Sequence, residues 1–182
     1  SNEGFDITAI DLPGHGKSEA GQTSLPEITD VIAEITTTQG PFDVLIAHSF
    51  GGVAGLNSIR LGAIYQKIVL ISLGVYEIRP MFENFVGLFG LDKQYYADRL
   101  FDRVETVFGV NPIEFGPDRF ADRIGVETLL VHCKDDGESK SEISVMVHEK
   151  MPNSQLYLTN NLGHRKLLGD AAVVQQIADF IK

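Results

Sequence analysis

The run over residues 44–52, VLIAHSFGG, constrains the fold of this chain more than any other segment. Its apolar start predicts a short strand, and the residues after Ser49 predict a helix. A turn this sharp forces the serine into an unfavourable backbone conformation and brings the flanking chains close together. Small residues are then needed two positions before and two positions after the serine, where Ala47 and Gly51 stand. The run therefore predicts a strand-to-helix turn that lifts the Ser49 hydroxyl above the end of a sheet.

Strand and helix patterns alternate along most of the chain. Strands are expected at 5–11, 42–47, 67–72, 128–133 and 155–159, and helices at 26–38, 50–61, 141–150 and 171–181. Ser24 and Asp170 stand where N-caps belong, and residues 12–23, which contain Gly, Pro and Ser, are expected to form a loop. This alternation predicts an α/β protein with a doubly wound, mostly parallel sheet.

The chain also contains the two partners that a reactive serine needs. A serine hydroxyl is a poor nucleophile until a base takes its proton and an acid orients that base. Asp135 and Asp136 follow the predicted strand at 128–133, and His164 lies in a glycine-bearing loop after the last strand. We therefore expect Ser49 to be the nucleophile and His164 the base. The alternative for Ser49 is an N-cap of the helix that follows it.

Four other histidines compete with His164 for the role of base. His15 lies in a Pro-Gly-His-Gly loop, where it holds a turn or borders the site. His48 should point away from the serine, into the packing between helix and sheet. His132 within a strand and His148 on an outer helix are interpreted as structural or solvated residues. His164 alone follows the last strand in a suitable loop.

With serine, aspartate and histidine in this chain order, the sequence resembles the α/β-hydrolase superfamily. In that family the acid is commonly the third residue after a glycine that ends its strand. Cys133 stands at the glycine position, so the resemblance implies that Asp136 is the acid and that Asp135 is a loop or cap residue. A solvated acidic turn is the alternative for both. The backbone N–H of Phe50 should form one half of the oxyanion hole.

The resemblance also implies a division of the chain into a core and a cap. The α/β-hydrolase core would comprise residues 1–73 and 124–182, and a small helical cap would comprise 74–123. The latter segment holds ten of the sixteen aromatic residues. The functional hypothesis is a lid whose aromatics line an apolar pocket, with Tyr76, Phe82, Phe85 and Phe89 as substrate-binding residues. The alternative is that they only pack the cap against the core.

The family's first three strands have no counterpart in this sequence, and the core is expected to be truncated at its N-terminus. In the family's strand order, the strand at 5–11 would then lack its usual neighbour beside the strand at 42–47. We expect that the 5–11 strand shifts across to pair with 42–47, or that another chain or an upstream segment fills the position. The second oxyanion donor should be missing or misplaced in the first two cases.

Composition narrows the classes of partner. A net charge of −10 disfavours nucleic acid and anionic membranes, since both would repel the chain. The single cysteine, Cys133, excludes an internal disulfide and fits a cytoplasmic protein. No cluster of residues has metal-ligand spacing, so neither a metal nor another cofactor is expected.

The residues and the resemblance lead to one principal functional hypothesis. We expect a serine hydrolase that cleaves a small carboxylic ester through an acyl-enzyme. Thioesters, lactones and carbon–carbon bonds next to a ketone are alternative substrates for the same groups. A non-catalytic ligand-binding or signalling protein on the same fold is the second hypothesis, because fold alone does not fix function.

Overall fold

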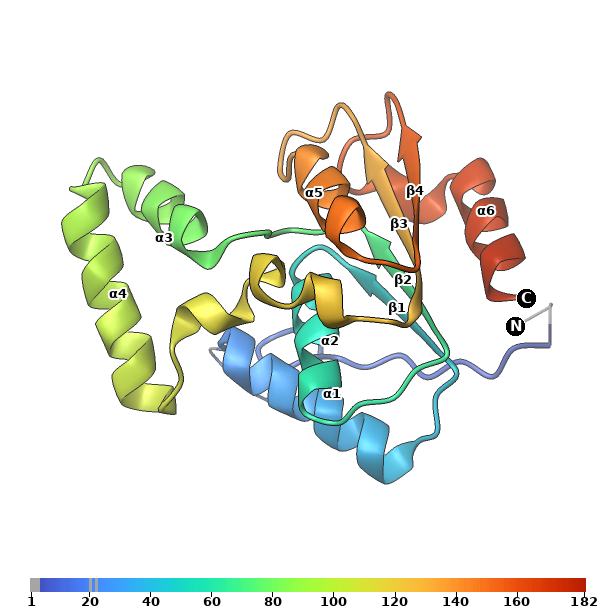
Figure 1. The fold of residues 1–182 in the computed structure, drawn as a ribbon, viewed down its shortest axis with the longest axis horizontal. Helices are drawn as coiled ribbons and strands as arrows, with labels where there is room; N and C mark the ends of the chain where they lie inside the picture. Colours follow the sequence, from blue (N-terminus) through green and yellow to red (C-terminus); the bar gives the residue numbers. More distant parts are fainter. Residues whose placement is uncertain (1–3, 20, 22) are drawn as a thin grey trace.

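A four-stranded parallel sheet forms the centre of the computed structural model, which describes residues 4–19, 21 and 23–182 (Figure 1). Its strand order is β1-β2-β3-β4, so neighbours in the sheet are also successive strands of the chain. The strands are β1 (Val44–His48), β2 (Lys67–Ile71), β3 (Glu127–Cys133) and β4 (Ser154–Thr159). The four later strands that the sequence predicts are therefore confirmed within one or two residues.

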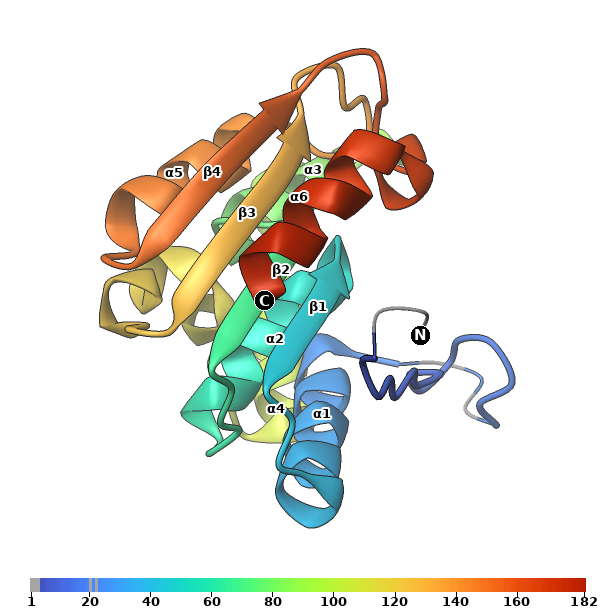
Figure 2. The same cartoon turned by 90° about the vertical axis from the view of Figure 1, so that its right-hand side faces the viewer.

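Helices cover both faces of this sheet, as predicted for a doubly wound fold. Figure 2 shows α2 (Phe50–Arg60) and α5 (Glu142–Lys150) on one face and α6 (Ala171–Ile181) on the other. The helix α1 (Leu25–Gln39) packs beside α2. Ser24 caps α1 by accepting from the backbone N–H of Glu27, and Asp170 caps α6, as the sequence predicts.

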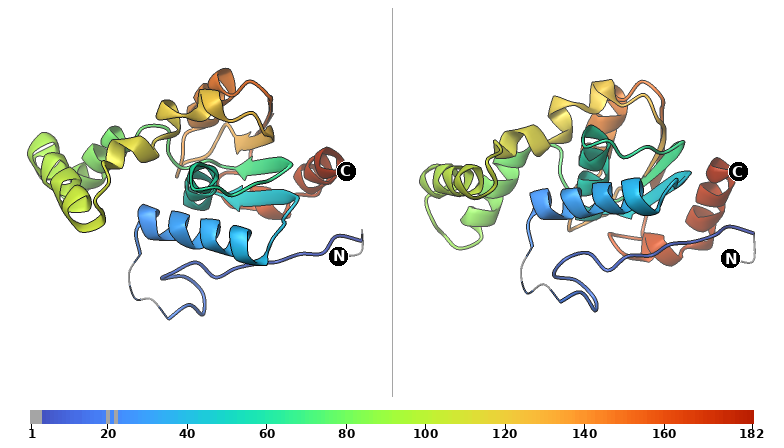
Figure 3. Two further views of the ribbon diagram at one scale, coloured as in Figure 1. Left: turned by 60° about the horizontal axis from the view of Figure 1, so that its bottom comes forward. Right: turned by 90° about the horizontal axis from the view of Figure 1, so that it is seen from below.

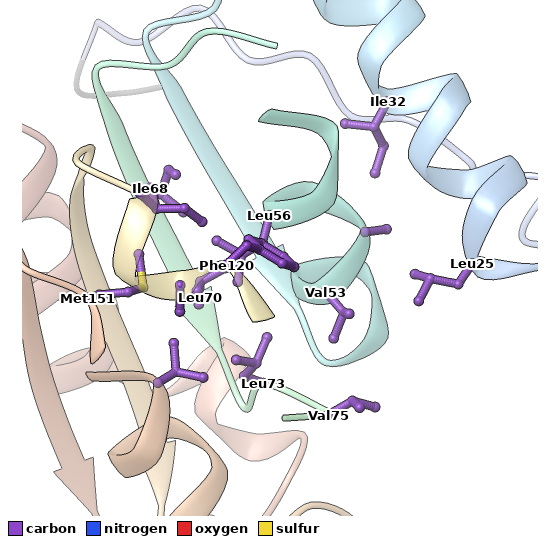
Figure 4. Close-up of a cluster of buried hydrophobic side chains, with 14 of the residues drawn as sticks. Leu25, Ile32, Val53, Leu56, Ile68, Leu70, Leu73, Val75, Phe120 and Met151 are labelled. Atoms are coloured by element: carbon purple, nitrogen blue, oxygen red, sulfur yellow. The ribbon is translucent and has the colours of Figure 1, made fainter. Parts of the chain in front are cut away.

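The alternation of side chains along β2 divides the core into two parts. Ile68 and Leu70 belong to the cluster beneath α2 and α5, whereas Val69 and Ile71 belong to the cluster beneath α6. Figure 4 shows the first cluster, in which β2 side chains meet Leu56 of α2. Both faces of β2 are thus buried, which explains its continuous apolar sequence.

The strand predicted at 5–11 is wrong. These residues are extended but belong to neither a strand nor a helix, and Ile7 and Ile10 are exposed. A strand requires backbone hydrogen bonds to a neighbour, and this stretch makes no ladder with any described strand, although β1 lies at the edge of the sheet (Figure 3). Nor does it shift across to β1, because β2 is the only strand paired with β1 among the described residues. The predicted loop at 12–23 includes positions 20 and 22, which lie outside the described residues.

A helical insertion lies between β2 and β3. It consists of α3 (Ile78–Gly87), α4 (Lys93–Phe108) and three short 3₁₀ helices, η1 (Pro112–Phe115), η2 (Pro117–Arg119) and η3 (Ala121–Arg123). Figure 1 shows that α3 and α4 project away from the sheet, whereas η3 lies close to α5. A fourth short helix, η4 (Lys166–Gly169), precedes α6. None of the described helices combines the length and the apolar character that crossing a membrane demands.

Candidate active site

Ser49 lies at the turn between β1 and α2 in a conformation that L-residues rarely adopt. Its φ is 54° and its ψ is −124°, and its backbone N–H donates to the carbonyl of Ile71 at the end of β2 (2.9 Å). Its side chain makes no capping hydrogen bond to α2, so the N-cap alternative does not explain this serine. A residue held in a strained backbone conformation by the surrounding structure is typical of a functional site.

The closest packing around this turn involves Gly52 and Gly55 rather than Gly51. A methyl group built at Gly51 meets no atom within 4 Å, so the predicted size limit at that position is wrong for the described structure. A methyl at Gly52 would lie 3.0 Å from a Leu73 methyl, and one at Gly55 would lie 2.7 Å from Leu45. These two glycines let α2 approach the strands closely.

Ser49, His164 and Asp136 form a continuous series of hydrogen bonds. The Nδ1–H of His164 donates to Asp136 Oδ2 over 2.7 Å, because a carboxylate can only accept. The Nε2 atom of the same ring is then an acceptor, and it lies 3.0 Å from Ser49 Oγ. The chemical result is a serine hydroxyl within proton-transfer distance of a base whose tautomer is fixed by an acid.

Asp136 is held as a carboxylate by donors on both oxygens. Its Oδ1 accepts from the backbone N–H groups of Glu138 and Ser139, each over 2.8 Å. Burial by itself would raise the pKa of Asp136, but the hydrogen bonds from Ser139, His164 and Glu138 outweigh it and lower that pKa below its ordinary value. Asp136 is therefore ionised at neutral pH.

Asp135 has a different contact. Its Oδ2 accepts from the backbone N–H of Asn161 over 2.7 Å, at the start of the loop that carries His164. The structure thus brings Asp136, and not its neighbour, to the histidine.

Cys133 holds the loop that carries His164 through hydrogen bonds to its sulfur. The Sγ atom accepts from the N–H groups of Leu162 (3.3 Å) and Gly163 (3.1 Å). Burial would raise the pKa of the Cys133 thiol, but hydrogen bonds with the backbone of Asp135, Leu162 and Gly163 outweigh burial and lower that pKa below its ordinary value. The cysteine is completely buried.

Two histidines other than His164 take part in this site. The sequence interpretation placed His48 away from the serine in helix–sheet packing, but its Nε2–H donates to the carbonyl of His164 over 3.0 Å. The prediction for His48 is therefore wrong. His132 is fully buried and lies beside Asp136, with Nε2 at 3.3 Å from Oδ2. The sequence carried no signal for either contact, since each depends on segments that meet only in the fold.

Gly74, just after β2, lies directly against the turn. A methyl group built on it would lie 3.3 Å from the Phe50 nitrogen and 3.5 Å from Ser49 Oγ. The Phe50 N–H is at the first position of α2, where N–H groups have no partner within the helix. The absence of a side chain at Gly74 therefore leaves space beside a backbone donor and a hydroxyl.

An apolar cavity of about 170 Å³ opens beside Phe50, between the N-terminal ends of α1 and α2 and the helical insertion. Its lining includes Ile78, Met81 and Phe82 from α3 and Phe115 from η1. Of the four aromatic residues predicted to bind substrate, Phe82 alone lines this cavity.

The other three predicted substrate-binding residues lie elsewhere. Phe85 and Phe89 are 54% and 65% exposed and line a separate hollow between α3 and α4. Tyr76 stacks under the ammonium of Lys150 at 5.8 Å and does not border either cavity. Helical periodicity could not have separated Phe82 from Phe85, because residues three apart lie near the same face of a helix.

Residues 4–19, 21 and 23–182 contain no candidate metal-binding site. No group of three His, Cys, Asp or Glu side chains there could hold a metal ion.

Comparison with known proteins agrees with the fold. Residues 1–175 match the model of the Alpha/beta hydrolase family. The chain is 25% identical to the uncharacterized hydrolase YugF of Bacillus subtilis (strain 168), over 98% of this chain and 81% of that protein.

Two solved structures illustrate the structural similarity. The esterase EaEST from Exiguobacterium antarcticum has a TM-score of 0.64 at 17% identity, with 94% of this chain and 80% of that chain covered. The monoacylglycerol lipase of Paleococcus ferrophilus has a TM-score of 0.64 at 18% identity, with 93% and 80% covered. At these identities the two structures show a shared fold.

Proposed function

The chain belongs to the alpha/beta hydrolase family, and from that premise we propose that it is a serine hydrolase acting on a small carboxylic ester through an acyl-enzyme. The observation that carries the proposal is the series Ser49 Oγ, His164 Nε2, His164 Nδ1 and Asp136 Oδ2, with separations of 3.0 and 2.7 Å. The named esterase and lipase neighbours support an ester as substrate class.

In the acylation step, Ser49 Oγ attacks the ester carbonyl carbon while His164 Nε2 takes the hydroxyl proton. The carbonyl oxygen becomes an oxyanion, for which the N–H of Phe50 is the proposed donor. The intermediate collapses when the ester C–O bond breaks, and the proton on His164 passes to the leaving alkoxide. A water molecule then repeats the same steps on the acyl-enzyme and releases the acid.

The apolar cavity beside Phe50 is the proposed acyl pocket. It lies next to the residue that follows the nucleophile, and α3 and η1 of the insertion form part of its wall. The insertion would therefore act as a cap that selects the acyl chain. A cavity of about 170 Å³ is small for a ligand pocket and suits a short or medium acyl group. Each methylene buried there stabilises the complex by about 0.8 kcal/mol.

A non-catalytic binding protein remains the competing function, and turnover separates the two. We expect hydrolysis of a short-chain nitrophenyl ester by the wild-type chain and its loss in Ser49→Ala. Ser58→Ala is a matched control, since Ser58 is a buried serine of α2 whose hydroxyl donates to the carbonyl of Gly55. Equal turnover by wild type and Ser49→Ala would refute the proposal, and so would the absence of turnover in both.

A further inference from the structure

The Asp136 carboxylate faces two imidazoles through one oxygen. Oδ2 lies 2.7 Å from His164 Nδ1 and 3.3 Å from His132 Nε2. His132 lies in β3, is fully buried and has no role in the reaction described above. A buried imidazole is retained at little cost only when its polar atoms are satisfied, so its contacts define what it does.

The contacts of His132 fix its tautomer. Its Nε2 faces the carbonyl of Ser139 at 3.0 Å as well as the carboxylate, and both of these groups can only accept. The hydrogen must therefore be on Nε2. Nδ1 then accepts from the hydroxyl of Ser144 on α5, over 2.7 Å. Burial lowers the pKa of His132, so this ring is neutral and carries a single N–H.

We propose that His132 is a positioning residue for the triad: its Nε2–H, shared between the Ser139 carbonyl and Asp136 Oδ2, holds that oxygen opposite His164 Nδ1, and the Ser144 hydroxyl supports this tautomer by donating to His132 Nδ1. The inference deepens the proposed function and depends on it for its catalytic meaning. With Oδ1 held by two backbone N–H groups, the contact from His132 supplies the remaining restraint on the carboxylate. Buried polar networks of this kind fix a single geometry when every member is satisfied.

A donor on Oδ2 also weakens that oxygen as an acceptor for His164. Removal of the His132 N–H leaves more charge on Oδ2 and so stabilises the protonated form of the His164 ring. The titration midpoint of His164 should then move to higher pH. A purely structural role for His132 would loosen the site but would give no reason for a shift in this direction.

Other ionisable groups surround the pair and stay constant in the experiment. They are His48 at the end of β1, Cys133 in β3, Asp135 and Glu138 in the loop after β3, and Arg165 beside His164.

Nitrogen-resolved NMR of the histidine rings tests the proposal without any need for turnover. In the wild type we expect His132 as the neutral Nε2–H tautomer at neutral pH. In His132→Leu, the His164 midpoint should rise by about half a pH unit or more. In His132→Gln, whose amide N–H can replace the Nε2–H, the His164 midpoint should lie close to its wild-type value. A wild-type Nδ1–H tautomer, or equal midpoints in all three proteins, would overturn the proposal.

A second pair of variants keeps the test decisive if His132→Leu does not fold. Ser144→Ala removes the hydroxyl that polarises His132, so the His164 midpoint should move in the same direction by a smaller amount. Ser154→Ala is the matched control, because Ser154 Oγ lies 2.7 Å from Nδ1 of His148, a pair distant from the triad. Equal His164 midpoints in Ser144→Ala and Ser154→Ala would contradict the role of Ser144. A wild-type Nδ1–H tautomer of His132 would contradict the role of His132 as well.

Ester kinetics then separate this inference from the proposed function. We expect His132→Leu to lower kcat about tenfold with little change in KM, and the acid limb of its rate profile to move with the NMR midpoint. His132→Gln should recover most of kcat. If the wild type lacks turnover, the proposed function fails while the NMR result still decides how His132 acts on Asp136. If the wild type is active and the variants match it, the positioning role alone fails.

Discussion

The Nε2–H of His48 donates to the carbonyl oxygen of His164 over 3.0 Å and joins the end of β1 to the loop that carries the proposed base. The two rings also lie 4.7 Å apart, centroid to centroid. Ser72 Oγ donates to the same carbonyl over 3.4 Å from the end of β2. Side chains at the ends of β1 and β2 therefore hold the backbone of the proposed base in place, in addition to its own hydrogen bond with Ser49.

The two neighbouring aspartates should differ greatly in importance. Asp136→Asn removes the charge that orients His164 and stabilises its protonated form, so kcat should fall about a thousandfold or more. Asp135→Asn keeps an oxygen that can accept from the Asn161 N–H, so kcat should change only a few-fold. Steady-state kinetics on a nitrophenyl ester give both values. A larger loss of kcat in Asp135→Asn than in Asp136→Asn would show that Asp135 is the acid.

Gly74 should tolerate no side chain during catalysis. Gly74→Ala places a methyl 3.3 Å from the Phe50 nitrogen and 3.5 Å from Ser49 Oγ, where the carbonyl of the ester must enter. We expect a loss of about a hundredfold in kcat/KM, comparable to the loss of one oxyanion donor. Gly51→Ala is the control, because its methyl meets no atom within 4 Å. Full activity in Gly74→Ala would place the oxyanion elsewhere.

The cavity beside Phe50 should determine the preferred acyl length. Phe82→Ala enlarges it, so the ratio of kcat/KM for an acyl chain of about eight carbons to that for acetate should rise about tenfold. Phe89→Ala changes an exposed aromatic in the other hollow and should leave the ratio unchanged. An identical acyl profile in wild type and Phe82→Ala would exclude this cavity as the acyl pocket.

Folding stability should decrease as the pH is lowered below about 6.5. Burial is the main cause that lowers the pKa values of His132 and His48 below their ordinary value of 6.5. Between the folded and unfolded pKa values the unfolded chain binds more protons, so the free energy of unfolding falls with falling pH in that window. Urea denaturation from about pH 7.5 to about pH 5 measures this slope.

The same titration has an internal control. His132→Gln removes one of the two groups, so its stability should depend less steeply on pH in that window. An equal slope in wild type and variant would show that His132 does not contribute.

The elements that the sequence predicted correctly are those encoded by local patterns. The turn at Ser49, the caps Ser24 and Asp170 and the buried strand β2 each follow from residues adjacent in the chain. Residues 5–11 have the same kind of pattern and still form no strand, because a strand also depends on a neighbour that local sequence does not specify.

In the candidate site too, local features could be predicted and long-range contacts could not. The resemblance to the α/β-hydrolase superfamily, with Cys133 at the family's glycine position, implied which aspartate faces His164, and the structure places Asp136 there. The contacts of His48 and His132 could not be predicted, since His48 meets a carbonyl 116 residues away and His132 acts through a loop and a helix that meet only in the fold. Similarly, composition identified an aromatic-rich insertion but not that Phe82 alone of the four would face the cavity.

The most direct test of the proposed nucleophile is the mass of the intact chain after treatment with a fluorophosphonate. The wild type should gain one phosphonyl group, and peptide mapping should locate it on Ser49, because its hydroxyl alone among the serines lies within hydrogen-bonding distance of Nε2 of His164 in the part of the chain that the structure describes. Ser49→Ala should gain none, and Ser58→Ala should be labelled like the wild type. A label on another serine, or an unlabelled wild-type chain that is folded, would contradict the account.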